Sequence, residues 1–181
     1  MLELHATCHV VLLVLPIRYK ELIIGAGGEN VAPVPLEDNV KKLCPVVSNI
    51  MMVGDKRKFN TAIVTLKCVG ATGELPGTDQ LLPQTIDPAV KTVGDAIKSA
   101  AFTKAITEAI EKTNKDGSCC PSPAAAIQRY VIVSPDFSVE GDELTATLKL
   151  KRSVAEKKFI KQIDAMYEAS MGKGECHFVF K

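Results

Sequence analysis

The sequence predicts an α+β fold: a small mixed sheet that contains a β-hairpin and is flanked by helices. Two apolar, β-branched runs predict the hairpin, residues 46–53 and 59–66, with five polar or glycine residues between them. A further strand is predicted at residues 127–134, where IQRYVIVS again combines branched and aromatic residues. Apolar residues at helical spacing before and after that strand supply the flanking helices.

Two predicted helices lie before the third strand. In the first, Leu36, Val40 and Leu43 recur in a stretch whose charges run from acidic to basic, which favours a helix with its dipole satisfied at both ends. The second begins at Ala89 and keeps one apolar face, with Ile106 and Ile110 beside it; the face consists of Val93, Ile97, Ala101, Ala105 and Ala109. Residues 69–88 are rich in Gly, Pro, Thr and Asp and are therefore predicted to be a loop or insertion.

The last predicted helix starts at Ser153. Ser153 and Glu156 have the spacing of a capping box, in which a hydroxyl and a carboxylate satisfy free backbone N–H groups at a helix start. The apolar face that follows repeats every four residues and consists of Ala155, Phe159, Ile163 and Tyr167. The segment from Gly172 onward shows no pattern.

The composition is that of an ordinary globular protein. Of the 181 residues 46% are hydrophobic and 24% are charged, and the net charge of +1 gives no electrostatic footprint for nucleic acid. The apolar run at residues 10–17 is far shorter than the ~20 residues that a membrane-spanning helix needs. A buried strand is the first interpretation of this run, and a signal peptide without a basic leader is the second.

Six cysteines are scattered along the chain without a CxxC pair, and no His lies at metal-ligand spacing from two of them. This pattern favours reduced thiols in a cytosolic protein and predicts no metal site.

Three segments are candidates for chemistry. The glycine cluster at residues 25–30 is neither a P-loop nor a dinucleotide fingerprint, so on its own it favours a simple turn between a strand and a helix. The run at residues 143–152 ends in three cations, which could meet a phosphate or carboxylate. The structural alternative, a solvated sheet edge protected by lysines, is favoured by spacing alone. The basic turn at residues 55–58 is explained by the hairpin, with a phosphate contact as the second interpretation.

Taken in order, these segments resemble the C-terminal part of long-chain fatty acyl-CoA synthetases, most closely the bubblegum type of the adenylate-forming, AMP-binding enzymes. The motifs are RxKELIIxxGGENVxPxPLE from Arg18, SNIMMVGDxRKF from Ser48 and SPDFSxxxxELTxTLKLKR from Ser134. The resemblance covers residues 18–168. It implies the fold of the C-terminal mobile domain of those enzymes.

The resemblance also implies a reaction in two steps. A fatty acid carboxylate attacks ATP to give an acyl-adenylate and pyrophosphate, and the thiol of CoA then displaces AMP. Lys149 matches the family lysine that reaches the carboxylate and phosphate in the first step, where an ammonium can neutralise developing charge. ATP with magnesium, and CoA, are the family's substrates; a large N-terminal domain mainly binds them, so no cofactor is expected for this chain alone.

Further roles follow from the same resemblance. Gly28, with Gly27 beside it, matches the glycine that faces the pantetheine tunnel in the thioester-forming state. Arg18 and Lys20 match the hinge and nucleotide-contact region, but the pivot itself is Ile17, whose β-branched side chain restricts the backbone freedom that a pivot uses. The three cations of the basic turn are candidate contacts for the CoA phosphates: Lys56, Arg57 and Lys58.

The expected organisation is a non-matching segment at 1–17, a C-terminal-like domain at 18–170 with a looser insertion at 69–126, and a tail at 171–181. The family's phosphate loop, adenine-binding motif and ribose-binding aspartate belong before residue 18, and nothing there resembles them. We therefore expect a truncated ligase part that is inactive alone, cytoplasmic or peripheral to the endoplasmic reticulum or another membrane. The alternative is a non-catalytic module that docks onto a full-length ligase, through its N-terminal domain, or onto another partner.

Overall fold

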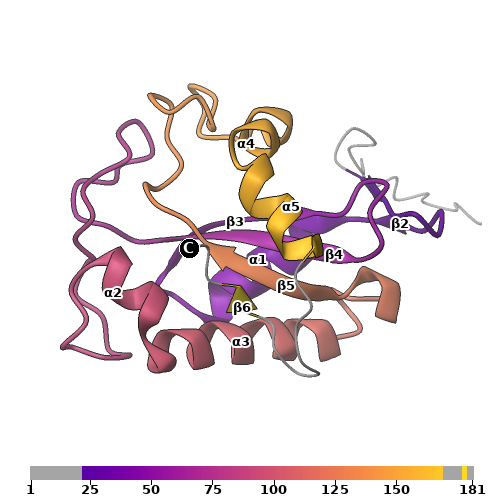
Figure 1. Cartoon of the computed structure of the whole chain (residues 1–181), viewed down its shortest axis with the longest axis horizontal. Coiled ribbons are helices and arrows are strands. Elements are labelled where there is room, and N and C mark those ends of the chain that lie inside the picture. The colour runs from indigo at the N-terminus through magenta and orange to yellow at the C-terminus, as the bar shows by residue number, and fades with distance from the viewer. Residues whose placement is uncertain (1–21, 169–176, 179–181) are drawn as a thin grey trace, which may run out of the picture.

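The protein is built on a four-stranded mixed sheet, shown here by a computed structural model that describes residues 22–168 and 177–178 (Figure 1). The strand order is β3-β4-β5-β6: β3 runs antiparallel to β4, while β5 and β6 run parallel to their neighbours. Their bounds are β3 Val47–Val53, β4 Asn60–Leu66, β5 Ile127–Ile132 and β6 His177–Phe178. The α+β class with a small mixed sheet and a hairpin is therefore confirmed.

Alternation along the strands divides the core between the two faces of the sheet. On β3, Ile50 and Met52 join one buried cluster, whereas Met51 and Val53 join the other. Successive side chains of a strand point to opposite faces, so a sheet covered on both sides needs continuous apolar runs. The predicted hairpin runs have this composition, and their hairpin is confirmed.

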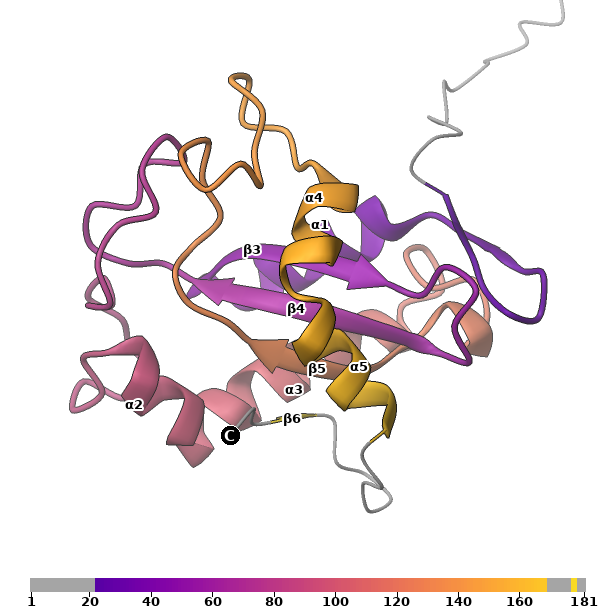
Figure 2. The same ribbon diagram turned by 45° about the horizontal axis from the view of Figure 1, so that its top comes forward.

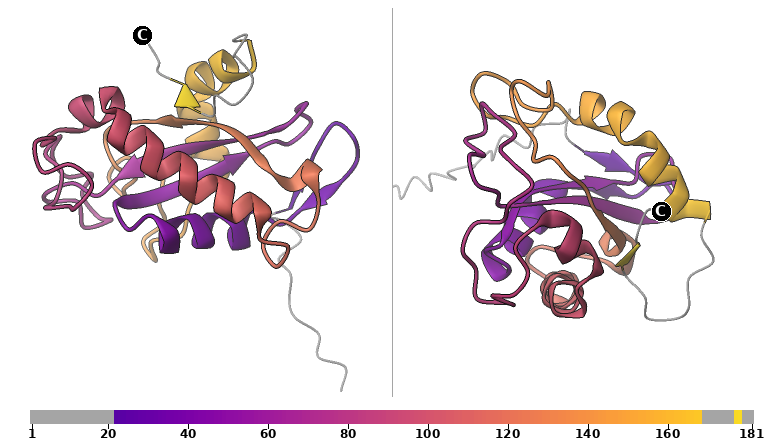
Figure 3. Two further views of the ribbon diagram at one scale, coloured as in Figure 1. Left: turned by 90° about the horizontal axis from the view of Figure 1, so that it is seen from below. Right: turned by 60° about the vertical axis from the view of Figure 1, so that its left-hand side comes forward.

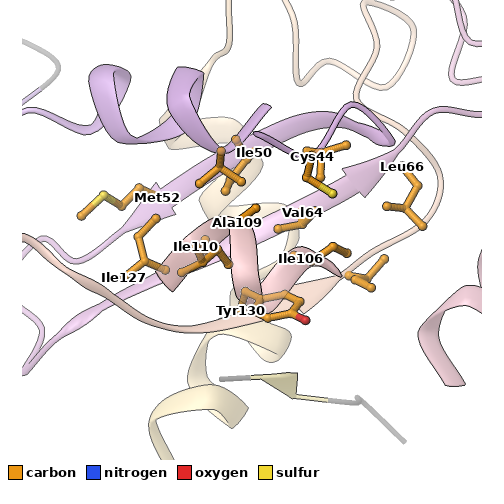
Figure 4. Packing of buried hydrophobic residues seen from close by; sticks show 14 of the residues in the cluster. Cys44, Ile50, Met52, Val64, Leu66, Ile106, Ala109, Ile110, Ile127 and Tyr130 are labelled. Carbon is orange, nitrogen blue, oxygen red and sulfur yellow. The ribbon is translucent and has the colours of Figure 1, made fainter. Parts of the chain in front are cut away.

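One face of the sheet is covered by helices α1 (Pro33–Leu43) and α3 (Ala100–Lys115), which lie side by side beneath it (Figure 3). Figure 4 shows Ile106 and Ile110 of α3 directed at the sheet, with Tyr130 of β5 beside them. The phenol of Tyr130 is completely buried and donates to the Thr103 carbonyl at 3.0 Å, so its polar end is satisfied.

The other face is covered by α4 (Arg152–Lys158) and α5 (Ile160–Glu168). Ala155, Phe159 and Ile163 are buried there, as the four-residue period predicts. The helix nevertheless breaks at Phe159, which ends α4 with φ −104° and ψ 20°. The predicted capping box is wrong: α4 begins at Arg152, so Ser153 lies inside the first turn, and no side chain caps the helix.

The long helix predicted from Ala89 is two helices, α2 (Val93–Lys98) and α3. Thr92 starts α2 by accepting from the Asp95 amide at 3.1 Å, and Ser99 interrupts the run in extended conformation, ending α2 and preceding α3. The buried face of α3 also differs from the predicted alanine stripe; it consists of Phe102, Ile106, Ala109, Ile110 and Thr113.

Two smaller predictions also need correction. In α1, Leu36 and Val40 are buried as predicted, but Leu43 is exposed and no acidic residue lies in the first turn. Pro33 begins this helix instead, because its fixed φ suits the first helical turn. The C-terminal segment contributes β6, whose pairing partners are Tyr130 and Val131.

Candidate active site

The glycine cluster forms a turn between two short strands, β1 (Ile23–Ile24) and β2 (Asn30–Val31), and not between a strand and a helix. Gly28 N donates to Gly25 O at 2.9 Å, and Gly25 N donates to Glu29 O at 3.2 Å. Gly28 has φ +78°, a conformation that side chains disfavour. A Cβ at Gly27 or Gly28 would meet no atom within 4 Å, so both positions face open space.

Backbone hydrogen bonds join the glycine turn to the basic turn of the β3–β4 hairpin. Ala26 N donates to Arg57 O at 3.0 Å, and Lys56 N donates to Ile24 O at 2.8 Å. The glycine turn and the basic turn are both predicted to contact CoA. They are distant in sequence, and these hydrogen bonds show that they lie in contact. Figure 2 shows these two turns at the same end of the molecule.

The three cations of the basic turn have different environments. Arg57 forms an ion pair with Asp164 at 2.8 Å, and its guanidinium lies 4.9 Å from the ring centre of Tyr167. That phenol donates to Phe59 O at 2.7 Å, and burial raises its pKa. Arg57 thus holds α5 against the hairpin, whereas Lys56 and Lys58 are exposed.

Lys149 lies on a tight, well-anchored turn rather than on a sheet edge. Thr145 N donates to Lys149 O at 2.8 Å, Leu148 N donates to Thr145 O at 2.8 Å, and Lys149 N donates to the Thr145 hydroxyl at 3.1 Å. A bridge between Leu144 and Leu150 closes the base of the turn. The backbone of Lys149 is therefore fixed, while its side chain is exposed.

The three cations at the end of this motif, Lys149, Lys151 and Arg152, differ in whether they form ion pairs. The Arg152 guanidinium donates to both carboxylate oxygens of Glu37, each at 2.7 Å, and Lys151 forms an ion pair with Asp142. Within residues 22–168, no carboxylate pairs with Lys149. Its positive charge is available to a ligand.

Two buried carboxylates that the sequence analysis did not single out hold this region in place. Glu37 accepts from the Met52 amide at 2.7 Å as well as from Arg152, and so ties α1 and β3 to the start of α4. Asp136 accepts from donors on β3, on β4 and in its own segment: Ser48 Oγ at 2.5 Å, Asn49 Nδ2 at 2.9 Å, Thr65 Oγ1 at 2.5 Å and Phe137 N at 2.8 Å. Their partners lie up to 115 residues away, so no local sequence signal marks them.

A cavity of about 460 Å³ lies beside the end of β3 and the start of α4. Its lining includes Leu22, Ile23 and Asp55, which lie before β1, on β1 and on the basic turn, as well as Leu150, Arg152 and Glu156. Leu150 directly follows Lys149 in the chain. The structure thus brings the glycine and basic turns together, and residues next to these turns and next to Lys149 line the same cavity.

The predicted hinge residues Ile17, Arg18 and Lys20 lie outside the described residues. Among the residues that the structure describes, no group of three or more His, Cys, Asp or Glu side chains could hold a metal ion. In the same part of the chain, no helix is long and apolar enough to cross a membrane. Burial raises the pKa of the Cys68 thiol to about 11, with Asp136 and Asp79 adding to the effect, so this thiol is unreactive at neutral pH.

Comparison with known proteins gives a consistent result. A family model described as the AMP-binding enzyme C-terminal domain matches residues 20–171. The long-chain-fatty-acid–CoA ligase ACSBG2 of Gallus gallus is 44% identical over 158 residues, covering 83% of this chain and 20% of the relative. ACSBG1 of Homo sapiens is 40% identical over 159 residues, covering 83% of this chain and 22% of the relative. The chain thus spans about a fifth of the length of these curated relatives.

Solved structures match as well. The A domain of the carboxylic acid reductase from Segniliparus rugosus aligns with a TM-score of 0.57 at 17% identity, covering 83% of this chain and 20% of that chain. The adenylation domain of the reductase from Mycobacterium chelonae aligns with a TM-score of 0.58 at 18% identity, covering 84% and 20%. These likenesses show a shared fold.

Proposed function

The chain belongs to the AMP-binding enzyme C-terminal domain family, and we propose that it serves as the C-terminal part of a long-chain fatty acid–CoA ligase. In the first step of that reaction, the fatty acid carboxylate attacks ATP, and acyl-adenylate and pyrophosphate form. In the second step, the CoA thiol displaces AMP and the thioester forms. Fatty acid, ATP with magnesium, and CoA are thus the proposed substrates, held mainly by the family's ATP-binding domain.

We assign the first step to Lys149. The observation that carries this assignment is the partition of charge in its motif: Lys151 and Arg152 have carboxylate partners, and Lys149 has none among the described residues. A compact ammonium on a fixed backbone can neutralise the negative charge that builds up between carboxylate and phosphate. Preorganisation by the Thr145 hydrogen bonds means that little reorganisation is needed during the reaction.

The test is Lys149→Ala in a complete ligase, made by joining this chain to the N-terminal part of its Gallus gallus relative. Pyrophosphate release should fall by ~10²–10³-fold, because removing one such stabiliser costs that much. Acyl-CoA formation from supplied acyl-adenylate should change far less. Lys157→Ala, which removes another exposed lysine of the same domain, should leave both steps at the parent rate. Equal loss in both steps for Lys149→Ala would contradict the assignment.

We assign the second step to the joined glycine and basic turns. The open space above Gly27 and Gly28 supports close approach of the pantetheine arm of CoA to the backbone. Lys56 and Lys58 are exposed and lie beside this turn, so they are the proposed contacts for CoA phosphates. Arg57 is the weaker candidate of the three, because Asp164 and Tyr167 already engage its guanidinium.

A further inference from the structure

The tip of the insertion, residues 71–77, is packed against the segment that carries Lys149. The tip is itself a closed turn, with a bridge between Ala71 and Pro76. Two backbone hydrogen bonds join it to the later segment: Val139 N donates to Gly73 O at 2.8 Å, and Glu140 N donates to Glu74 O at 3.1 Å. Figure 2 shows the magenta insertion loop beside the orange segment that leads to α4.

A side-chain contact continues this packing to the residue before Lys149. A Cβ at Gly73 would lie 3.0 Å from Leu148 Cδ2 and 3.3 Å from Cδ1, so the leucine lies directly over the glycine. Leu148 has φ +57°, which is costly for a side chain of this size, and half of its surface is exposed. Neither burial in the core nor a favourable backbone explains its conformation. The contact with Gly73 and the Thr145 hydrogen bonds hold it in place.

We propose that the insertion tip is a brace that sets the position of Lys149, with Gly73 and Leu148 as positioning residues. The inference rests on the proposed role of Lys149 in adenylation. Gly73 touches no substrate. It acts by leaving room for Leu148, whose backbone leads directly into Lys149. The Leu148 and Lys149 amides both donate to Thr145, so a change in how the Leu148 side chain packs on Gly73 would displace this hydrogen-bonded turn, and Lys149 with it, as one unit.

Gly73→Ala and Gly70→Ala are a matched pair that tests the brace. Both glycines have φ near +80° in the same loop, so both alanines meet the same backbone strain. At Gly70 the new Cβ would meet only Gly77 Cα, at an ordinary 3.7 Å, whereas at Gly73 it would lie 3.0 Å from Leu148 Cδ2, so the leucine side chain would have to shift by a few tenths of an ångström. In the complete ligase, Gly73→Ala should lower kcat for adenylation on the order of tenfold, as small misplacements of catalytic groups do. KM for ATP should stay unchanged, and Gly70→Ala should keep the parent kcat.

Leu148→Ala breaks the same contact from the exposed side, where the fold does not depend on it. We expect it to lower adenylation as well, and adding Gly73→Ala should then cost nothing further, since the two changes remove one interaction. Additive losses, or equal behaviour of Gly73→Ala and Gly70→Ala, would overturn the brace.

Amide hydrogen exchange in the 181-residue chain separates this inference from the proposed function. Gly73→Ala should speed exchange at the Leu148 and Lys149 amides, which donate to Thr145, and Gly70→Ala should not. If Lys149→Ala leaves adenylation intact while this exchange difference is seen, the assignment of Lys149 fails. The insertion tip would then position the Leu148–Lys149 turn without a role in adenylation. If the exchange rates match in both variants, the brace itself fails.

Discussion

At the scale of single residues, the three cations at the end of the Lys149 motif differ in their partners. Arg152 meets a buried carboxylate, and its planar fork matches both oxygens of Glu37. Lys149 meets no carboxylate in the described chain and projects from a turn. The sequence alone suggests one basic patch, because Lys149, Lys151 and Arg152 lie within four residues. The structure distinguishes them, since Lys151 and Arg152 pair with carboxylates and Lys149 pairs with none in the described chain.

A prediction at this scale concerns Gly28 and the second, thioester-forming step. Gly28→Leu in the complete ligase should block acyl-CoA formation from supplied acyl-adenylate and spare pyrophosphate release, because the side chain would fill the open space beside the glycine turn. The positive φ adds backbone strain of roughly 1 kcal/mol. Gly70→Leu carries the same strain at φ +80° in a distant loop and is the control. Thioester formation at the parent rate by Gly28→Leu would contradict the tunnel assignment.

At the scale of elements, the molecule is held together by contacts between segments far apart in sequence. Glu37 on α1 meets Arg152 at the start of α4, and Asp136 after β5 meets side chains of β3 and β4. These links explain where α4 begins: Arg152 is placed by its ion pair, so the helix starts there and not at a capping serine.

The Glu37–Arg152 pair should be strongly coupled. Arg152→Met leaves the Glu37 carboxylate buried without its partner and should lower the free energy of unfolding by about 3 kcal/mol. The double variant Glu37→Gln with Arg152→Met should recover much of this loss, because no unpaired charge then remains. Urea denaturation of the 181-residue chain measures Glu37→Gln, Arg152→Met and the double variant, with Lys157→Met as an exposed control. Losses that simply add would show that the pair contributes no coupling.

Elements with strong local patterns were predicted well. The β3–β4 hairpin follows from continuous apolar, β-branched runs, and α1 and the apolar face of α4 and α5 follow from helical spacing. The sequence does not predict the break at Ser99, because a serine within a run of helical spacing does not by itself indicate a helix end. It does not predict the pairing of β6 either, because a strand of two residues is too short to show an alternating pattern. The motif residues came from the family resemblance, whereas the supporting carboxylates Glu37 and Asp136 depend on long-range packing that no local pattern encodes.

At the scale of the whole molecule, residues next to the glycine turn and residues next to Lys149 line one cavity. The Lys149 turn serves the proposed first step, and the glycine turn serves the second. Two proposed steps that use different turns of one small domain agree with the mobile C-terminal domain that the family resemblance implies.

The isolated chain should consequently be inactive. Fatty acid-dependent release of AMP should be absent with the 181 residues alone and should appear when an ATP-binding ligase domain is supplied, since the role proposed for Lys149 requires groups that such a domain would hold. Omitting ATP is the control for background. Binding to the supplied domain without any activity would favour the docking module, and activity of the chain alone would overturn the view that it depends on another domain.

The parallel pairing of β4 and β5 has a consequence for how the chain folds. The β3–β4 hairpin closes locally, but β5 can join it only after the connection between Leu66 and Ile127 has looped back. Contacts across such separations form slowly, because closing the loop costs conformational entropy before the strand pairing stabilises the chain. The segment with Lys149 extends from β5, so the position of Lys149 depends on this pairing between distant parts of the chain.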